Sequence, residues 1–125
     1  MKYLGVDFGL KRIGLAQSEG AIASPLKVLE VRNLKNAIEQ VVELVKKEGF
    51  DKVIVGLPEG KIGRMVNGFI NSLRKKGLDV LEADETLSTK QATYQMIELN
   101  IPKKKRQVND AYSAGIILQE YLDSL

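Results

Sequence analysis

The chain has 125 residues, of which 44% are hydrophobic and 28% charged, and its formal net charge at pH 7 is +3. This composition is typical of a soluble globular protein, and the length predicts one domain, residues 1–125, with a real core. The absence of cysteine and histidine excludes thiolate zinc sites, cysteine nucleophiles, and histidine as a general base or metal ligand. Any metal must therefore be held by oxygen atoms, which favours Mg2+ or Mn2+ as the cofactor.

Neither a membrane span nor a signal peptide is indicated by the sequence. No apolar run approaches the roughly 20 residues that a membrane helix needs, and Asp7 comes too early for the apolar segment of a signal peptide. We therefore expect a cytoplasmic protein with no membrane partner. The net charge of +3 is a weak indication of an anionic partner.

The first predicted elements are two strands joined by a turn, in the stretch YLGVDFGLKRIGLA from Tyr3 to Ala16. Short apolar runs around glycines predict a hairpin, with Asp7 at the end of its first strand and the basic pair Lys11 and Arg12 in its turn. A lone carboxylate on a strand that the core needs is costly unless something compensates it. A bound cation would do so, and so would local backbone amides, and this stretch alone favours neither.

The remaining elements are predicted from apolar periodicity and from capping residues. They are a strand at residues 21–31, a helix from residue 34 that ends by Gly49, a strand at 52–57, a helix carrying the apolar stripe 66–73, a strand at 78–83, a helix at 88–99 and a last helix after the N-cap Asn109. Asn33 is the predicted N-cap of the first helix, and Gly77 ends the second. Pro25 indicates that the third strand lies at an edge of the sheet.

This order of elements predicts an α/β protein with a mixed five-stranded sheet. The expected strand order is 3-2-1-4-5, with the first three strands antiparallel, right-handed crossovers, and helices on both faces. The first strand must be interior, because only then can its end meet the end of the fifth strand and the last helix.

Acidic residues from distant parts of the chain converge in this arrangement. They are Asp7 at the end of the first strand, Asp84 and Glu85 at the end of the fifth, and Asp110 at the start of the last helix. Ligands bind at the carboxyl ends of parallel strands in open α/β folds. Carboxylates gathered there repel one another unless cations neutralise them, and two Mg2+ ions about 4 Å apart can hold both reacting oxygens of a phosphodiester cleavage. Each acid taken alone also fits an ordinary turn, loop or helix start.

Two groups of cations are predicted to contact nucleic acid. One is the basic run Lys103, Lys104, Lys105 and Arg106, which is a solvated loop by default but would hold a phosphate backbone if it lies beside the metal site. The other is the pair Lys11 and Arg12 in the first turn. In the same turn, Gly9 is predicted either to hold a conformation costly for a residue with a Cβ or to let a substrate phosphate approach the backbone.

Four stretches together resemble the signature blocks of the YqgF/RuvX family. They are GVDFGLKRIGLA, VGLP (Val55 to Pro58), DETLST (Asp84 to Thr89) and the pattern D-A-x-x-A-x-x-I-L-Q from Asp110 to Gln119. They occur in the family's order and span essentially the whole chain. The resemblance implies an RNase H-like fold of the Holliday-junction-resolvase type. It also implies a cytoplasmic bacterial nuclease that trims the 5′ end of the precursor of 16S ribosomal RNA.

The same resemblance assigns the acids by position. Asp7, the acidic pair and Asp110 match the family's acidic positions, and as the member of the pair that holds the metal we take Glu85, which is nearer the strand's end. The three would then be both catalytic residues and metal ligands. Two departures bear on substrate geometry: Thr86 stands where the family usually has arginine, and the loop after VGLP, at residues 59–61, is shorter than usual.

Three other functions are consistent with the residues. The first hairpin also resembles that of ATPases of the actin and sugar-kinase class, but those enzymes close two such domains around a nucleotide and 125 residues supply one. A non-catalytic nucleic-acid-binding module on the same fold would bind without cutting. A Holliday junction resolvase would act on branched DNA and normally as a dimer, and the sequence indicates neither a monomer nor a homodimer.

Overall fold

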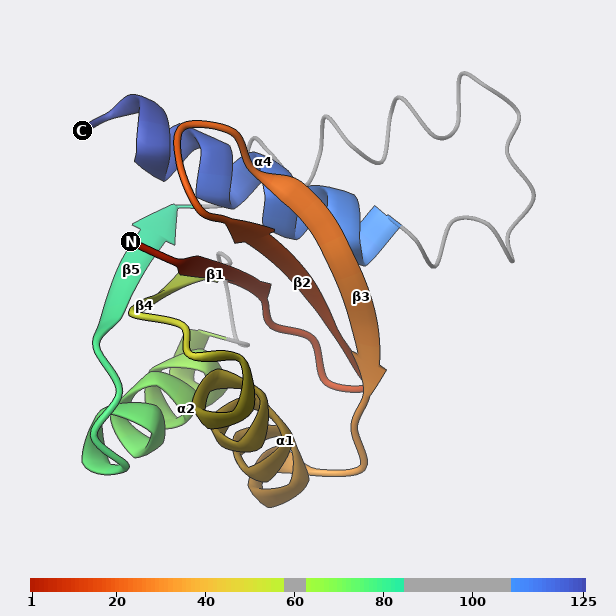
Figure 1. The fold of residues 1–125 in the computed structure, drawn as a ribbon. Coiled ribbons are helices and arrows are strands. Elements are labelled where there is room, and N and C mark those ends of the chain that lie inside the picture. Colours follow the sequence, from red (N-terminus) through yellow and green to blue (C-terminus); the bar gives the residue numbers. More distant parts are fainter. Residues whose placement is uncertain (58–62, 85–108) are drawn as a thin grey trace, which may run out of the picture.

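The computed structural model describes residues 1–57, 63–84 and 109–125, drawn in colour in Figure 1. Its elements in chain order are β1 (Tyr3–Asp7), β2 (Arg12–Ser18), β3 (Ser24–Glu30), α1 (Leu34–Glu48), β4 (Lys52–Leu57), α2 (Gly63–Lys75), β5 (Val80–Asp84) and α4 (Asn109–Asp123). The predicted helix at 88–99 lies outside the described residues. No helix within them is long and apolar enough to cross a membrane.

The sheet has the order β3-β2-β1-β4-β5, which confirms the predicted topology and the interior place of the first strand. β1 and β2 are antiparallel, as are β2 and β3, whereas β1 with β4 and β4 with β5 are parallel. Pro25 lies on β3, at an edge of the sheet, as predicted from its missing N–H donor.

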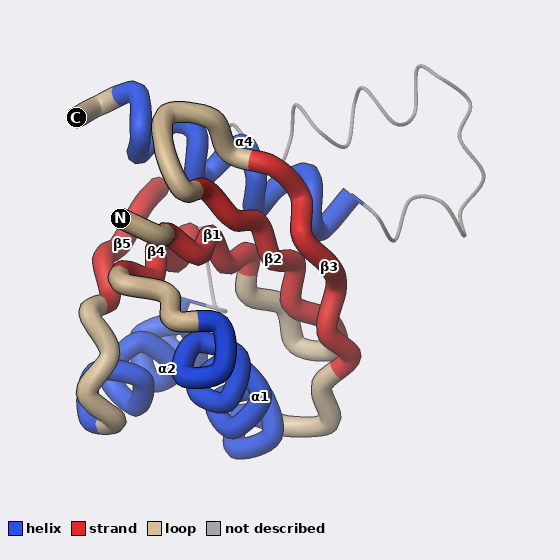
Figure 2. The backbone as a smooth tube through the Cα atoms, viewed as in Figure 1, coloured by secondary structure: helices blue, strands red, loops and turns tan. Residues whose placement is uncertain are grey.

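The two faces of the sheet follow from the alternation of side chains along β1. Leu4 and Val6 point to one face, where they join the larger core with Val41 of α1 and Phe69 of α2. Tyr3 points to the other face and packs against a smaller core under α4. The buried residues of that core are Ala16, Ile54, Ala114, Ile117 and Leu118. Figure 2 shows α1 and α2 on one side of the strands and α4 on the other, which confirms the prediction of helices on both faces.

The predicted ends of α1 and the predicted end of α2 are confirmed, whereas Asn109, predicted as the N-cap of the last helix, is the first residue of α4 itself. The side chain of Asn33 accepts a hydrogen bond of 2.8 Å from the backbone N–H of Asn36, satisfying one of the free donors in the first turn of α1. Gly49, with φ of 72°, and Gly77, with φ of 90°, follow α1 and α2. Both have the left-handed conformation that favours glycine at this position.

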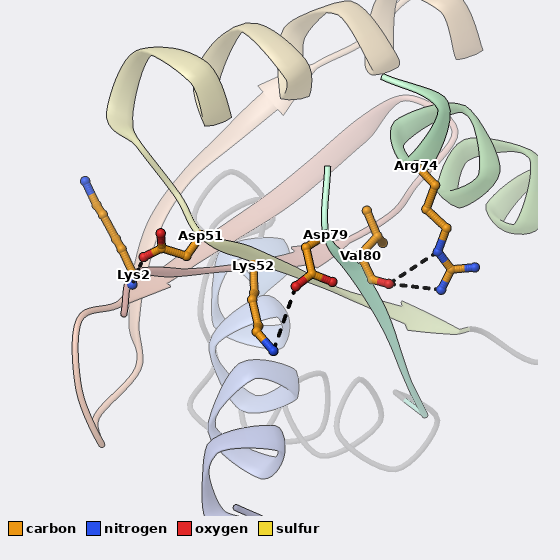
Figure 3. A network of polar contacts seen from close by, with 6 residues as sticks. All are labelled: Lys2, Asp51, Lys52, Arg74, Asp79 and Val80. Carbon is orange, nitrogen blue, oxygen red and sulfur yellow. Dashed lines mark hydrogen bonds and ion pairs between the residues drawn. The ribbon is translucent and has the colours of Figure 1, made fainter. Parts of the chain in front are cut away.

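A polar network ties together the amino ends of the three parallel strands (Figure 3). The backbone N–H of Lys2 donates to a carboxylate oxygen of Asp51 at 2.7 Å, and Lys52 Nζ lies 3.8 Å from Asp79 Oδ2. The guanidinium of Arg74, from α2, donates to the first carbonyl of β5 at 2.9 and 3.3 Å. These contacts align the amino ends of β1, β4 and β5, so their carboxyl ends also lie together.

Candidate active site

Asp7 is the last residue of β1 and lies at the carboxyl edge of the parallel strands. It is buried, with 8% of its surface exposed, and its parity with Tyr3 places it on the face that α4 covers. β5 ends at Asp84, whose backbone pairs with Leu57 at the end of β4. The ends of β1, β4 and β5 therefore share one edge, the part of open α/β sheets where ligands bind.

The start of α4 rests directly on the backbone of β2 beside Asp7. Gly14 is the cross-strand partner of Asp7, and a Cβ on Gly14 would collide with the backbone carbonyl of Asp110 and the amide nitrogen of Ala111. Side chains directly opposite each other on antiparallel strands share one face of a sheet. Asp7 and Asp110 therefore approach the same point of the sheet, one from β1 and the other from α4.

Small residues continue this close contact along α4. A Cβ on Gly5 of β1 would lie 2.8 Å from both the carbonyl oxygen of Ala114 and the Cβ of Leu118. On the helix side, Ala111 and Ala114 are buried. Because the small residues glycine and alanine line this contact, α4 packs close to the sheet. The close packing places Asp110 near the carboxyl edge of the strands.

An ion pair joins the first turn to α4. Arg12 Nε donates to Asp110 Oδ2 at 3.2 Å, and the two side chains are 43% and 32% exposed. Solvent screens a pair exposed to this extent, so its contribution to stability is small. Its structural effect is to place a guanidinium beside the second of the two carboxylates.

The turn that carries Arg12 is closed by backbone contacts. A Cβ on Gly9 would collide with the carbonyl oxygen of Arg12, and the carbonyl of Lys11 accepts a 2.9 Å hydrogen bond from the N–H of Val31. Among the described glycines only Gly49 and Gly77 have a positive φ. A side chain at Gly9 is therefore costly, as predicted, but through collision with the turn's own backbone rather than through a left-handed conformation.

The structure brings together two of the three predicted metal ligands. Carboxylate oxygens suit Mg2+ and Mn2+, so Asp7 and Asp110 fit such an ion in the kind of donor that they offer. Within the described ranges there is no group of three or more acidic residues that could hold a metal. Glu85 and the basic run at residues 103–106 lie outside those ranges, so the third ligand and these phosphate contacts stay predictions.

Sequence reasoning missed two residues of α4. The hydroxyl of Ser113, one turn after Asp110, is buried and has no hydrogen-bond partner among the described residues. Gln119 Oε1 accepts from the N–H of Ala23 at 2.8 Å, and its Nε2 donates to the carbonyl of Ala21 at 2.9 Å. Gln119 thereby clamps the connection between β2 and β3 to α4. The I-L-Q pattern, which ends at Gln119, is the sequence feature from which this residue could have been recognised.

Replacing Gln119 by alanine is expected to lower the free energy of unfolding by about 1.5–4.5 kcal/mol, since three hydrogen bonds worth roughly 0.5–1.5 kcal/mol each are lost, the third being that from Nε2 to Asp123 Oδ1. Amide hydrogen exchange at Ala23 should become faster. Gln119→Glu retains the acceptor for Ala23 but loses the donor for Ala21 and places a second carboxylate beside Asp123, so this variant should also be less stable than the parent while its Ala23 amide stays better protected than in the alanine variant. Unchanged protection at Ala23 in the alanine variant would show that the clamp does not hold this connection.

The fold is shared with solved structures of Holliday junction resolvases. RuvC of Thermus thermophilus, in complex with a Holliday junction substrate, matches with a TM-score of 0.65 and 16% identity over 99% of this chain and 94% of its own. The fowlpox virus resolvase in complex with substrate Holliday junction DNA matches with a TM-score of 0.68 and 17% identity over 99% and 98%. At these identities the likeness shows a shared fold.

Sequence similarity then gives the family. The RuvX family, described as Holliday junction resolvase, matches residues 1–124. A relative from Bacillus cereus (strain G9842) is 37% identical over 136 residues, covering 99% of both chains. Another, from Anaplasma marginale (strain St. Maries), is 37% identical over 132 residues, covering 98% of this chain and 84% of the relative. Both are named as candidate pre-16S rRNA nucleases. The chain belongs to the RuvX family, as the four sequence blocks predicted.

Proposed function

We propose that this protein is a metal-dependent nuclease of the cytoplasm that processes the 5′ end of the 16S ribosomal RNA precursor by phosphodiester hydrolysis. The observation that carries the proposal is the contact at Gly14, which brings Asp7 and Asp110 to one point at the carboxyl edge of the sheet. The names of the relatives support the RNA precursor as substrate.

Asp7 and Asp110, with Glu85 as the third ligand, would hold Mg2+ or Mn2+. Such an ion, when bound, supplies Lewis-acid stabilisation of the phosphoryl oxygens and an activated water. Asp7 is fixed by the central strand and is buried, so solvent screens its charge only weakly. Asp110 is more exposed and its side chain lies nearer the rim. The protein thus offers one buried carboxylate fixed by the sheet and one more exposed carboxylate that is paired with Arg12.

The test is incubation of the purified protein with 16S rRNA precursor and with four-way DNA junctions, each with Mg2+, Mn2+ or a chelator. We expect metal-dependent cleavage of the RNA precursor near its mature 5′ end. The description of the family as Holliday junction resolvase supports the alternative of junction resolution, which would appear as paired cuts in the DNA. Binding of either nucleic acid without cleavage under any metal condition would contradict the proposal and favour a non-catalytic module.

Neutralising the basic run is expected to weaken binding of the RNA precursor and to flatten its salt dependence. The variant replaces Lys103, Lys104, Lys105 and Arg106 by glutamine; four fewer phosphate contacts would reduce the slope of log affinity against log salt by roughly 3–4. The measurement is a salt titration of binding. A matched control neutralises four exposed lysines at the ends of α1 and α2, remote from the carboxyl edge: Lys46, Lys47, Lys75 and Lys76. Equal slopes in the two variants would show that the run makes no specific phosphate contact.

A further inference from the structure

The ion pair between Arg12 and Asp110 differs in place from the other ion pairs of the described residues. Two of those, Lys2–Glu48 and Lys52–Asp79, lie at the amino ends of the parallel strands, and Arg74–Glu82 joins α2 to β5. The Arg12–Asp110 pair alone among them engages a carboxylate proposed here as a metal ligand. A divalent cation and this guanidinium would therefore compete for one carboxylate.

We propose that Arg12 is a positioning residue that holds Asp110 in the metal-free protein and transfers to a phosphate oxygen of the nucleic acid when the cation takes Asp110. This inference rests on the proposed function. In the metal-free state the guanidinium neutralises Asp110 next to Asp7, so two carboxylates can approach one point at low cost. In the loaded state the cation takes over that role, and the guanidinium is left at the rim of the site.

Exposure makes this transfer possible. At 43% and 32% exposure, the two side chains form a weak, screened pair that a bound cation can displace. A fully buried pair would resist separation, because each charge would be left without a partner in a low dielectric. The planar fork of the released guanidinium suits the two free oxygens of a phosphodiester better than an ammonium group does.

The backbone at Arg12 is fixed, so only the side chain has to move. Arg12 pairs with Glu30 in the sheet, Lys11 accepts from the N–H of Val31, and Gly9 abuts the carbonyl of Arg12. With the backbone held in this way, the guanidinium can swing from Asp110 to a point nearby without a change in the fold. It therefore stays within reach of a strand bound at the carboxyl edge.

The test compares the parent protein with Arg12→Met, Arg12→Lys and Lys11→Met. The first readout is Mn2+ binding measured by calorimetry without nucleic acid. Arg12→Met should bind Mn2+ about two- to fivefold more tightly, the range that corresponds to losing an exposed ion pair. Its melting temperature should also rise more on addition of Mn2+ than that of the parent. Arg12→Lys keeps the charge and should bind Mn2+ like the parent.

The second readout is RNA binding and cleavage at saturating Mn2+. Here the expected effect of Arg12→Met is a loss, whereas its expected effect on Mn2+ affinity is a gain. Arg12→Met should bind RNA more weakly and cleave more slowly than the parent, and Arg12→Lys should recover part of the loss. Lys11→Met, which removes a cation outside the ion pair, should weaken RNA binding with little change in Mn2+ affinity. A merely structural Arg12 would lower Mn2+ affinity and RNA cleavage together.

The outcomes separate this inference from the proposed function. If the parent binds Mn2+ and cleaves RNA while Arg12→Met gains no Mn2+ affinity, the transfer is wrong and the nuclease stands. If Arg12→Met gains Mn2+ affinity but binds and cleaves RNA like the parent, Arg12 shields Asp110 without contacting phosphate, and the second half of the inference is wrong. If the parent binds no Mn2+, both proposals fail.

Discussion

Replacing Gly14 by alanine is expected to lower the free energy of unfolding by about 1–3 kcal/mol, the usual range for overpacking a close contact. The added methyl group would meet the backbone of Asp110 and Ala111, and a backbone cannot turn away as a side chain can. The start of α4 must lift, and Asp110 lifts with it. The cleavage rate should therefore fall by about 10²-fold, the cost of a displacement near 1 Å, even where the variant remains folded.

A matched control is available on the same helix. Gly115→Ala would place a Cβ 3.9 Å from the Cβ of Ala16 and 4.0 Å from the nitrogen of Pro25, which are ordinary contact distances. Alanine also has a helix propensity about 1 kcal/mol better than that of glycine, so this variant should be as stable as the parent or more so, with unchanged cleavage. Denaturant unfolding and a cleavage assay measure both effects. Full activity in Gly14→Ala would show that the height of α4 does not position Asp110.

Asp7→Asn is expected to reduce cleavage by about 10²-fold or more, since a metal site supplies several kcal/mol of transition-state stabilisation. Its stability without metal should be unchanged or raised, because repulsion between Asp7 and the other carboxylates is relieved. Mg2+ should raise the melting temperature of the parent by mass action, and this increment should shrink in the variant.

The control for Asp7 is an acid at the opposite edge of the sheet, away from the proposed metal site. Asp51 accepts the N–H of Lys2 at 2.7 Å, so Asp51→Asn should lower the melting temperature and leave the Mg2+ increment unchanged. Thermal melts of the three proteins with Mg2+ or chelator separate the two roles. An Asp7→Asn protein that melts lower in chelator and still cleaves RNA would refute the nuclease mechanism.

Local chemistry explains which parts of the fold were predictable. Asn33, Gly49 and Gly77 act on backbone groups a few residues away, so their roles are readable in the sequence. Pro25 excludes an interior strand by its missing donor. The order of the sheet then follows from the sequence of elements and from the handedness of the crossovers.

Strand boundaries were harder to predict because side chains and helix ends compete for the backbone. The predicted third strand starts at residue 21, but the observed one starts at Ser24, since Gln119 takes the carbonyl of Ala21 and the N–H of Ala23. The predicted fifth strand starts at residue 78, but the N–H of Leu78 donates to Leu73 and closes α2 instead. Neither contact can be recognised from the apolar pattern of the strand itself.

The candidate site was predictable in its acids but not in their contacts. Asp7 and Asp110 stand out as acids at the ends of predicted elements. The pairing of Arg12 with Asp110 joins residues 98 positions apart and depends on how low α4 lies on the sheet. Gly14, which sets that height, looks in the sequence like an ordinary glycine after a turn.

The glycine contact under α4 has a consequence for the order of events during synthesis. Among the described residues, 1–84 carry the five strands and the two helices of one face, whereas the cover of the other face is α4. Because a chain leaves the ribosome amino end first, the early product has one finished face and one apolar face still open. Asp7 and Asp110 can approach each other only after α4 has docked on the sheet, so the proposed metal site assembles later than the sheet on which it stands.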